Sequence, residues 1–356
     1  MSEISFHDRL EKRSFALSKP PAMITAKALG AMPDFAISEL GERKTLCLLS
    51  DSGLAESLIR ERLGYIPENA LCEFVTGIGR ALGEDCLGLL FSPYLTVKDY
   101  GAWGSFVLAA PDLGAALLRA QREMRLHSNT DRVEFVQQGN TVSYAYKFGL
   151  KNHVSYPDMA YSAVAAMLSI PRSYLGQNWS PSRIEFDFPK ERGSGQAEET
   201  FGCPTLFDRP KLRLVFPKSV LAAPALKPGL AMPTTRSDII RERQTPPANM
   251  LQSIRVVVDM QIADRNASLE RVSQAMGIGP RSVQRQLSTY GTHFRELLNA
   301  AKMDRACELL RLKGSSIAGV ADALGYREPG NFTRAFKTRF GTSPSKYARS
   351  AYTLVR

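Results

Sequence analysis

The stretch that decides the fold lies near the end of the chain. Ser316–Tyr347 reads SIAGVADALGYREPGNFTRAFKTRFGTSPSKY. Its apolar spacing predicts a short helix over Ile317–Leu324 that stops at Gly325, and a second helix over about Pro329–Phe340. The second helix carries three basic residues between phenylalanines, namely Arg334, Lys337 and Arg339. Two short helices with a glycine turn and a basic outer face are typical of a DNA-reading helix-turn-helix, although an ordinary helical hairpin has the same outline.

A second copy of this pattern lies upstream and favours the DNA-reading interpretation. A helix over Leu269–Met276 stops at Gly277, and the next helix is expected over Pro280–Tyr290, where a first-turn proline is tolerated. The two turn glycines lie 48 positions apart, and each follows a small residue, Ser273 or Ala321, by four positions. A long helix over about 293–312 fills the interval. The sequence therefore predicts an all-α C-terminal domain with two helix-turn-helix motifs joined by a long helix.

The charge distribution points to the same part of the chain. The whole protein has 356 residues and a net charge of +11. From Ser268 to Arg356 there are fifteen Lys or Arg and six Asp or Glu, so +9 of this charge falls on the last quarter. A concentrated positive field beside helix-turn-helix spacing favours a polyanionic partner, and we expect double-stranded DNA.

The cysteine content argues against a fold held by disulfide bonds or by a bound metal. The five cysteines are odd in number, widely spaced and without a C-x-x-C pair; they are Cys47, Cys72, Cys86, Cys203 and Cys307. We expect reduced thiols in a cytoplasmic protein, with no metal and no cofactor, and a redox-sensing cysteine is the alternative. The charged N-terminus is unlike a signal peptide, and no apolar run predicts a membrane span.

Helix and strand signals mix between about 31 and 225, which predicts an α/β (α+β) domain. The clearest signal is a hairpin, RVEFVQ and TVSYAYKF around Gly139–Asn140. We expect strands at 182–188 and 211–216, helices at 52–63, 69–82, 111–126 and 159–170, and a strand or short helix at 45–50. Residues 1–30 are expected to form a loose arm. The proline-rich segment 226–249 is expected to be a linker, interrupted by a short helix over Arg236–Glu242.

The C-terminal module, over about 250–350, resembles the AraC/XylS-type transcriptional regulators. The matching stretches are SLERVSQAMGIGPRSVQRQL, FRELLNAAKMDRACELL and LGYREPGNFTRAFKTRFGTSPSKY, with the tail G-x-S-P-x-x-Y at Gly341, Ser343, Pro344 and Tyr347. In the N-terminal part the stretches DYGAWGSFVLAAPDLGAALLRAQREMRLHS and FGCPTLFDRPKLRLVFP stand out. Through them, residues 31–225 resemble the arabinose-binding/dimerisation type of N-terminal domain, of the ornithine-utilisation-regulator-like branch. The resemblance implies a nucleoid-associated bacterial regulator, more often an activator than a repressor. Such a regulator senses a small-molecule effector, recruits RNA polymerase and binds promoter DNA as a homodimer.

Both the residue types and the resemblance select the same base-reading candidates. Arg281, Gln284 and Arg285 project together from the first reading helix, and Arg–guanine and Gln–adenine are favoured major-groove pairings. In the second helix, Asn331 and Arg334 occupy base-reading positions of the family.

The remaining candidates of this module are expected to bind the DNA backbone. The phosphate-binding candidates are Ser268, Thr292, Ser316, Lys337, Arg339 and Lys346. Helix capping explains the three hydroxyl residues equally well. Pro329 and Gly330 stand where some family members carry polar contacts, so the second helix is expected to read fewer bases.

The effector site is indicated only by residue type. Aromatic and polar side chains suited to a small-molecule pocket are Tyr100, Trp103, His127, Tyr144, Tyr146, His153, Trp179 and Arg183. Arg183 and Arg213 either neutralise a ligand carboxylate or pair with Glu185. No nucleophile with a base at motif spacing occurs, so we expect no enzyme. The alternative is an effector-independent DNA-binding regulator whose N-terminal domain serves dimerisation or partner binding.

A third class is an enzyme fused to the DNA module, such as a cysteine-based alkyl-transfer repair sensor. That class needs a zinc-like cysteine cluster near the N-terminus. Cys47, Cys72 and Cys86 lack this spacing. The sequence therefore disfavours it.

Overall fold

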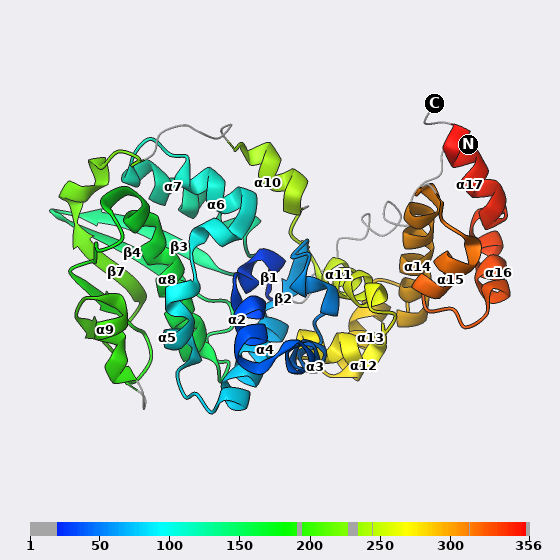
Figure 1. Cartoon of the computed structure of the whole chain (residues 1–356), viewed down its shortest axis with the longest axis horizontal. Helices are drawn as coiled ribbons and strands as arrows, with labels where there is room; N and C mark the ends of the chain where they lie inside the picture. The colour runs from blue at the N-terminus through cyan, green and yellow to red at the C-terminus, as the bar shows by residue number, and fades with distance from the viewer. Residues whose placement is uncertain (1–19, 191–193, 227–233, 244, 313, 354–356) are drawn as a thin grey trace. The chain divides into compact units, whose positions relative to one another are not determined.

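The computed structural model describes residues 20–190, 194–226, 234–243, 245–312 and 314–353. The chain divides into two compact units, one containing Ala22–Ser52 and Leu58–Ala248 and the other containing Gly53–Ser57 and the chain from Asn249 onward (Figure 1). The first unit is mixed α/β and the second is entirely helical, as predicted. Within the described residues, no helix is both long and apolar enough to cross a membrane.

The first unit is built on a five-stranded sheet. Its strand order is β3-β4-β7-β5-β6, and every neighbouring pair is antiparallel except β5–β6. A separate antiparallel pair joins β1 to β2. The strands are β1 (Met23–Thr25), β2 (Tyr65–Pro67), β3 (Arg132–Gln138), β4 (Thr141–Lys147), β5 (Arg183–Glu185), β6 (Thr205–Leu206) and β7 (Leu212–Pro217).

The predicted hairpin around Gly139–Asn140 is confirmed, because β3 and β4 pair in register across it. Alternation along β4 places Val142 and Tyr144 in the core. Phe216 and Leu214 on β7 are their cross-strand partners and are also buried. Helix α8 packs against β7, so this face of the sheet forms the core of the unit (Figure 1).

Helices surround the sheet and the two-stranded pair. The α-helices of this unit are α2 (Met32–Leu40), α3 (Glu42–Ser52), α4 (Glu68–Leu82), α5 (Leu87–Phe91), α6 (Gly101–Leu108), α7 (Leu113–Glu123), α8 (Tyr156–Leu175), α9 (Ala197–Phe201) and α10 (Arg236–Arg243). The 3-10 helices are η1 (Ala26–Leu29), η2 (Glu56–Ile59), η3 (Ser92–Tyr94), η4 (Val97–Tyr100), η5 (Met124–Leu126), η6 (Ser194–Gln196) and η7 (Lys218–Ala222).

Several boundaries differ from the sequence predictions. The expected arm is shorter, because β1 and η1 fall inside 1–30 and bury Met23 and Leu29; residues 1–19 lie outside the described part. The helix expected over 52–63 is wrong: α3 ends at Ser52, Gly53 has a positive φ of 82°, and only η2 forms. Helix α8 runs past Pro171 to Leu175 because Ile170 and Tyr174 on either side are buried, and packing outweighs the proline cost.

The second unit contains seven helices within its described residues. They are α11 (Met250–Ala263), α12 (Leu269–Met276), α13 (Pro280–Thr289), α14 (Phe294–Arg311), α15 (Ile317–Ala323), α16 (Pro329–Phe340) and α17 (Pro344–Thr353). Helices α12–α13 and α15–α16 are the two predicted helix-turn-helix motifs, and α14 is the predicted long connecting helix.

Candidate DNA-binding interface and effector pocket

The two helix-turn-helix turns have the same backbone geometry. Gly277 and Gly325 adopt left-handed φ values of 65° and 70°, which glycine tolerates without steric cost. The residue after each glycine donates its N–H to the small residue five positions earlier, Ile278 to Ser273 at 3.1 Å and Tyr326 to Ala321 at 2.9 Å. The internal repeat in the sequence is therefore a repeat in hydrogen bonding.

Helix α13 divides into a buried face and a basic face. Val283 and Leu287 are fully buried. The polar candidates Arg281, Gln284 and Arg285 are exposed together on the other side of the helix. Within residues 245–312, no ion pair or side-chain hydrogen bond engages Arg281 or Arg285, so their donors can meet base edges.

Helix α16 has the same two-faced construction. Phe332 and Phe336 are fully buried, whereas Asn331 and Arg334 are exposed. Tyr347 of the tail motif packs on the inner face of α16, with its ring 5.5 Å from Phe336, and its hydroxyl accepts a hydrogen bond from Arg311 on α14. The family tail therefore holds the second reading helix in place.

The phosphate candidates separate into two groups. Lys337, Arg339 and Lys346 are exposed cations, as phosphate contacts require. Ser268 caps α12 and Ser316 caps α15, each accepting a backbone N–H, so capping accounts for both.

The interpretation of Thr292 needs correction. Its side chain is buried, with 2% exposure, and its hydroxyl donates to Glu296 at 3.1 Å. The residue that caps α14 is His293, through a capping box with Glu296. A buried hydroxyl that already has an acceptor is not a surface ligand for phosphate.

Three contacts join α11 and α14 to each other and to the second reading motif. Arg265, which follows α11, has φ 57° and forms an ion pair with Asp322 of α15 at 2.9 Å. Arg255 of α11 bonds Asp304 of α14 at 2.8 Å. The Lys302 ammonium lies 4.9 Å from the ring centroid of Tyr326, and burial lowers the pKa of this lysine. Helix α14 is therefore held to elements on both sides of it.

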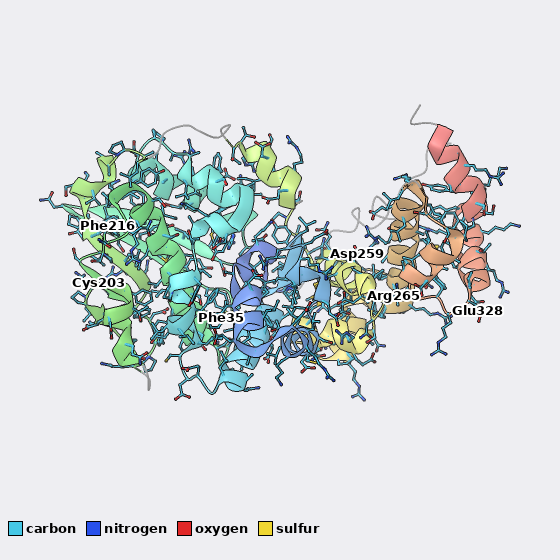
Figure 2. The ribbon with its side chains drawn as sticks, viewed as in Figure 1. Phe35, Cys203, Phe216, Asp259, Arg265 and Glu328 are labelled. Atoms are coloured by element: carbon cyan, nitrogen blue, oxygen red, sulfur yellow. The ribbon has the colours of Figure 1, made fainter. Side chains whose placement is uncertain are left out.

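One residue at the interface was missed by the sequence reasoning. Glu328 is the N-cap residue of α16 and is exposed, directly before Pro329 (Figure 2). A carboxylate at the start of a reading helix opposes phosphate and can accept a hydrogen bond from cytosine N4. The sequence signal that could have identified Glu328 is its position directly before the predicted start of the second reading helix.

An aromatic pocket gathers most of the effector candidates. Tyr100, Trp103, His127, Tyr144 and Tyr146 all line one cavity of about 50 Å³. Its apolar wall comes from η4, β3 and α8, through Val97, Val133, Ala163, Ala166, Met167 and Ile170, with Met124 from η5. Pocket residues that are far apart in sequence are thus brought together by the sheet and α8.

His127 is the polar group at the centre of the pocket's aromatic cluster. Its ring lies 4.8 Å from the ring of Tyr100 and 5.2 Å from the ring of Trp103. The indole N–H of Trp103 donates to the carbonyl oxygen of Glu123 at 2.9 Å, which fixes the orientation of the indole. The cluster therefore presents preorganised rings with one titratable imidazole among them.

Two buried carboxyl groups lie behind Tyr146. Its hydroxyl donates to Asp131, which is fully buried and also accepts the Gly149 N–H at 2.8 Å. Glu68, likewise fully buried, accepts hydrogen bonds from Ser128 at 2.7 Å and Thr130 at 3.0 Å. Burial raises the pKa of both carboxyl groups, and the charge of Glu68 raises the pKa of Asp131 further. Burial therefore favours the protonated, uncharged form of these two carboxyl groups.

The other effector candidates lie elsewhere. Trp179 packs edge-on against Phe216, at 5.5 Å between ring centroids, and does not line the aromatic pocket. Arg183 donates to Glu185 at 2.8 Å and Arg213 does so at 2.7 Å, so both arginines pair with an internal carboxylate. The pairing alternative is the one that the structure supports.

His153 also lies outside the pocket lining. Its Nε2 lies 3.2 Å from Glu73 and its Nδ1 lies 2.9 Å from the Ser155 hydroxyl. These contacts account for the side chain without a ligand.

The helix in the expected linker, α10, is part of the first unit. Glu242 of α10 accepts the backbone N–H of Ala102 at 2.6 Å, and its other oxygen lies 3.5 Å from Lys27. Arg236 at the start of α10 pairs with Glu123 at 3.0 Å, and Ile239 is fully buried. This helix therefore contacts α6, the helix that carries Trp103 into the pocket.

Comparison with known proteins agrees with this architecture. Residues 46–225 match the arabinose-binding domain of AraC transcription regulators, and residues 272–350 match a helix-turn-helix domain. The ornithine utilization regulator of Pseudomonas aeruginosa is 25% identical over 293 residues, covering 80% of this chain and 84% of that protein.

Two other relatives match over shorter stretches of the chain. A helix-turn-helix regulator of Mycobacterium bovis is 40% identical over 78 residues, 22% of this chain and 23% of that protein. The transcriptional activator RhrA of Rhizobium meliloti is 31% identical over 124 residues, 34% of this chain and 39% of that protein. The matched proteins are regulators rather than enzymes. The chain therefore belongs to the AraC-type transcription regulators, with an arabinose-binding type of N-terminal domain and a helix-turn-helix DNA-binding domain.

Proposed function

We propose that this regulator is a transcriptional activator that binds promoter DNA through α13 and α16 and responds to a small molecule in the aromatic pocket. The observation that carries the DNA part is the pair of exposed polar faces on these helices, with Arg281, Gln284 and Arg285 on one and Asn331 and Arg334 on the other. Exposed Arg, Gln and Asn at helical spacing are suited to direct readout of bases.

The route from pocket to DNA is proposed to run through α6 and α10. Tyr100 and Trp103, on either side of the start of α6, line the pocket, and Glu242 of α10 binds the first turn of α6. A ligand that displaces Trp103 changes the contact between α6 and α10. Because α10 precedes the DNA-binding unit in the chain, this also changes the segment that leads into that unit. Such coupling requires different ligand affinities in the two states of the attachment.

Dimerisation and recruitment of RNA polymerase belong to the same proposal. A homodimer would bind two copies of its site, so sequences selected from a random pool should contain repeated half-sites. The alternative is a regulator that binds no effector. It is favoured by the small size of the cavity, about 50 Å³, which a ligand larger than a few atoms enters only if side chains move.

The experiment that tests the proposal has two readouts on the full chain. Selection of bound sequences from random duplex DNA should return a repeated motif, and transcription from a promoter carrying it should rise with added regulator. A thermal-shift screen of cell metabolites should find a compound that stabilises the protein and changes its DNA affinity. Failure of the selection overturns DNA readout, whereas selection without any active metabolite supports the effector-independent alternative.

A further inference from the structure

A second cavity, of about 300 Å³, lies in the first unit and has the opposite chemistry from the aromatic pocket. It is lined by Lys98 of η4, by Ser169, Arg172 and Ser173 on another face of α8, and by Thr200 of α9, among others. Within the described residues, neither Asp nor Glu lines this cavity. It is therefore a polar, positively charged site.

Arg172 is one of the two cationic side chains that line this cavity, with Lys98. Its Nε donates to the carbonyl oxygen of Trp179 at 3.0 Å and its Nη2 donates to that of Phe201 at 3.1 Å. No ion pair holds this guanidinium within the described part of the chain, and burial lowers its pKa. A half-buried cation that is oriented by two carbonyl groups but lacks a counter-charge is stabilised by an anion.

The hydroxyl groups set a second requirement for the ligand. Ser169 donates to the Ala166 carbonyl at 2.7 Å, Ser173 donates to the Ser169 carbonyl at 2.8 Å, and Ser92 donates to Gly88 at 2.7 Å. Because each serine proton is committed to a helix carbonyl, the serine oxygens offer only lone pairs to the cavity. A ligand that uses them must bring its own donors.

We propose that this cavity binds a small anion that also carries hydroxyl groups, such as a hydroxycarboxylate or a sugar phosphate. Arg172 and Lys98 take the anionic group, and the serine oxygens accept the ligand hydroxyls. The volume is in the range of small-molecule sites. This inference does not depend on the effector proposed for the aromatic pocket, which uses different side chains.

The site adjoins the aromatic pocket through one hydrogen bond. The backbone N–H of Val97 donates to the Ser169 hydroxyl oxygen at 2.8 Å. Val97 lines the aromatic pocket, whereas Ser169 lines the polar cavity. An anion that contacts Ser169 is therefore linked to the wall of the aromatic pocket by the hydrogen bond between Val97 and Ser169.

The test uses the full-length Trp103→Phe variant, in which Trp179 is the remaining tryptophan of the two in the chain. Its backbone carbonyl accepts a hydrogen bond from Arg172, so we expect its fluorescence to change when an anion binds Arg172. The probes are citrate and glucose 6-phosphate, with tricarballylate and glucose as matched compounds that lack the hydroxyl and the anionic group, respectively. We expect saturable binding of citrate or glucose 6-phosphate, and weaker binding of its matched compound.

Two substitutions in the Trp103→Phe background localise the signal. Lys98→Gln should weaken binding about 2- to 5-fold, because Lys98 is exposed and screened. Arg172→Met should weaken it about 10-fold or more. Lys147→Gln, an exposed lysine on β4, makes the same charge change away from the cavity and should have no effect.

The inference is overturned if neither anion binds, if glucose binds as well as its phosphate, or if Lys98→Gln and Lys147→Gln behave alike. Binding of citrate alone assigns a carboxylate ligand, and binding of glucose 6-phosphate alone assigns a phosphate ligand. Thermal unfolding of Arg172→Met shows whether it folds; if it does not, Lys98→Gln decides the outcome.

Discussion

The Glu242 carboxylate accepts a hydrogen bond from the backbone N–H of Ala102 at 2.6 Å, so the helix that follows the N-terminal domain caps a helix that lines its pocket. An anion is favourable at a helix N-terminus, where backbone N–H groups lack helical partners. Gly101, with φ 62°, makes room for it, because a Cβ there would collide with the Glu242 carboxylate. The positive φ favours glycine at this position, and a side chain there would also displace the Glu242 carboxylate.

Glu242→Gln should loosen α10 from the first unit. Loss of the charged hydrogen bond at Ala102 should cost about 1–2 kcal/mol locally. Hydrogen exchange should therefore accelerate in the first turn of α6 and across α10, in the absence of any ligand. Glu39→Gln, an exposed glutamate on α2, is the matched control. Equal protection of α10 in both variants would show that this bond does not hold the helix.

Arg285→Ala should weaken selective promoter binding while the fold stays intact. Arg285 is exposed on α13 beside Gln284, and loss of a bidentate base contact costs about 1–3 kcal/mol. Affinity for the selected site, measured by titration with fluorescent duplex, should fall about 5- to 150-fold. Arg305→Ala, on α14 and paired with Glu308, should bind normally. Unchanged affinity in the Arg285 variant would remove this residue from the reading set.

Lys337→Ala should weaken binding to all sequences alike. An exposed lysine at the C-terminal end of α16 supplies charge to the backbone without reading bases. The slope of log affinity against log salt should decrease by about 1, because one phosphate contact is lost. Measurement at several salt concentrations on specific and random duplexes checks this. A loss confined to one base position would show that Lys337 reads bases.

Gly330→Gln should add specificity to the second reading helix. A Cβ at Gly330 meets no heavy atom within 4 Å, so the substitution fits α16. A glutamine there can bond adenine, and we expect a new preference of about 1–3 kcal/mol at one position of the site. Binding to a panel of single-base site variants measures it. Gly325→Gln is the contrasting change, because φ 70° makes a side chain strained there and should lower stability.

The pair formed by Glu68 and Asp131 should make the first unit less stable as pH rises. Both folded-state pKa values are raised, so their favourable contribution is complete below the unfolded pKa of about 4 and is lost as pH rises through the folded values. Urea unfolding at pH 5, 7 and 8 should show this fall in wild type. Glu68→Gln should make stability less dependent on pH, whereas Glu134→Gln, on the surface, should leave this dependence unchanged. If the free energy of unfolding falls equally with pH in wild type and in Glu68→Gln, Glu68 and Asp131 do not share a proton.

The C-terminal domain was largely predictable because its signals are local. Apolar spacing fixed the buried faces of α13 and α16, and Gly277 and Gly325 marked the turns that their positive φ values confirm. The exposed faces then follow from helix geometry alone. Thr292 is the exception. Whether it caps a helix or is a buried hydrogen-bond partner of Glu296 depends on where a neighbouring side chain lies.

The N-terminal site depended on contacts that a linear pattern does not contain. Residue type selected Tyr100, Trp103, His127, Tyr144 and Tyr146, which the fold brings to one cavity, but it could not separate them from Trp179 and Arg183. The strand order β3-β4-β7-β5-β6 decides which side chains share a face. The buried acids lack any short-range signal, because Glu68 and Asp131 are 63 positions apart in the chain.

By itself, the sequence determined the double helix-turn-helix, its basic faces and the family, because periodicity, turn glycines and charge act over a few residues. Tertiary structure alone decided which aromatic residues form the pocket, that two buried carboxyl groups lie behind Tyr146, and that the expected linker caps α6 through Glu242. These features arise where segments that are far apart in the sequence pack against one another and exclude water. Burial and hydrogen bonding between such segments depend on the packed fold rather than on neighbouring residues.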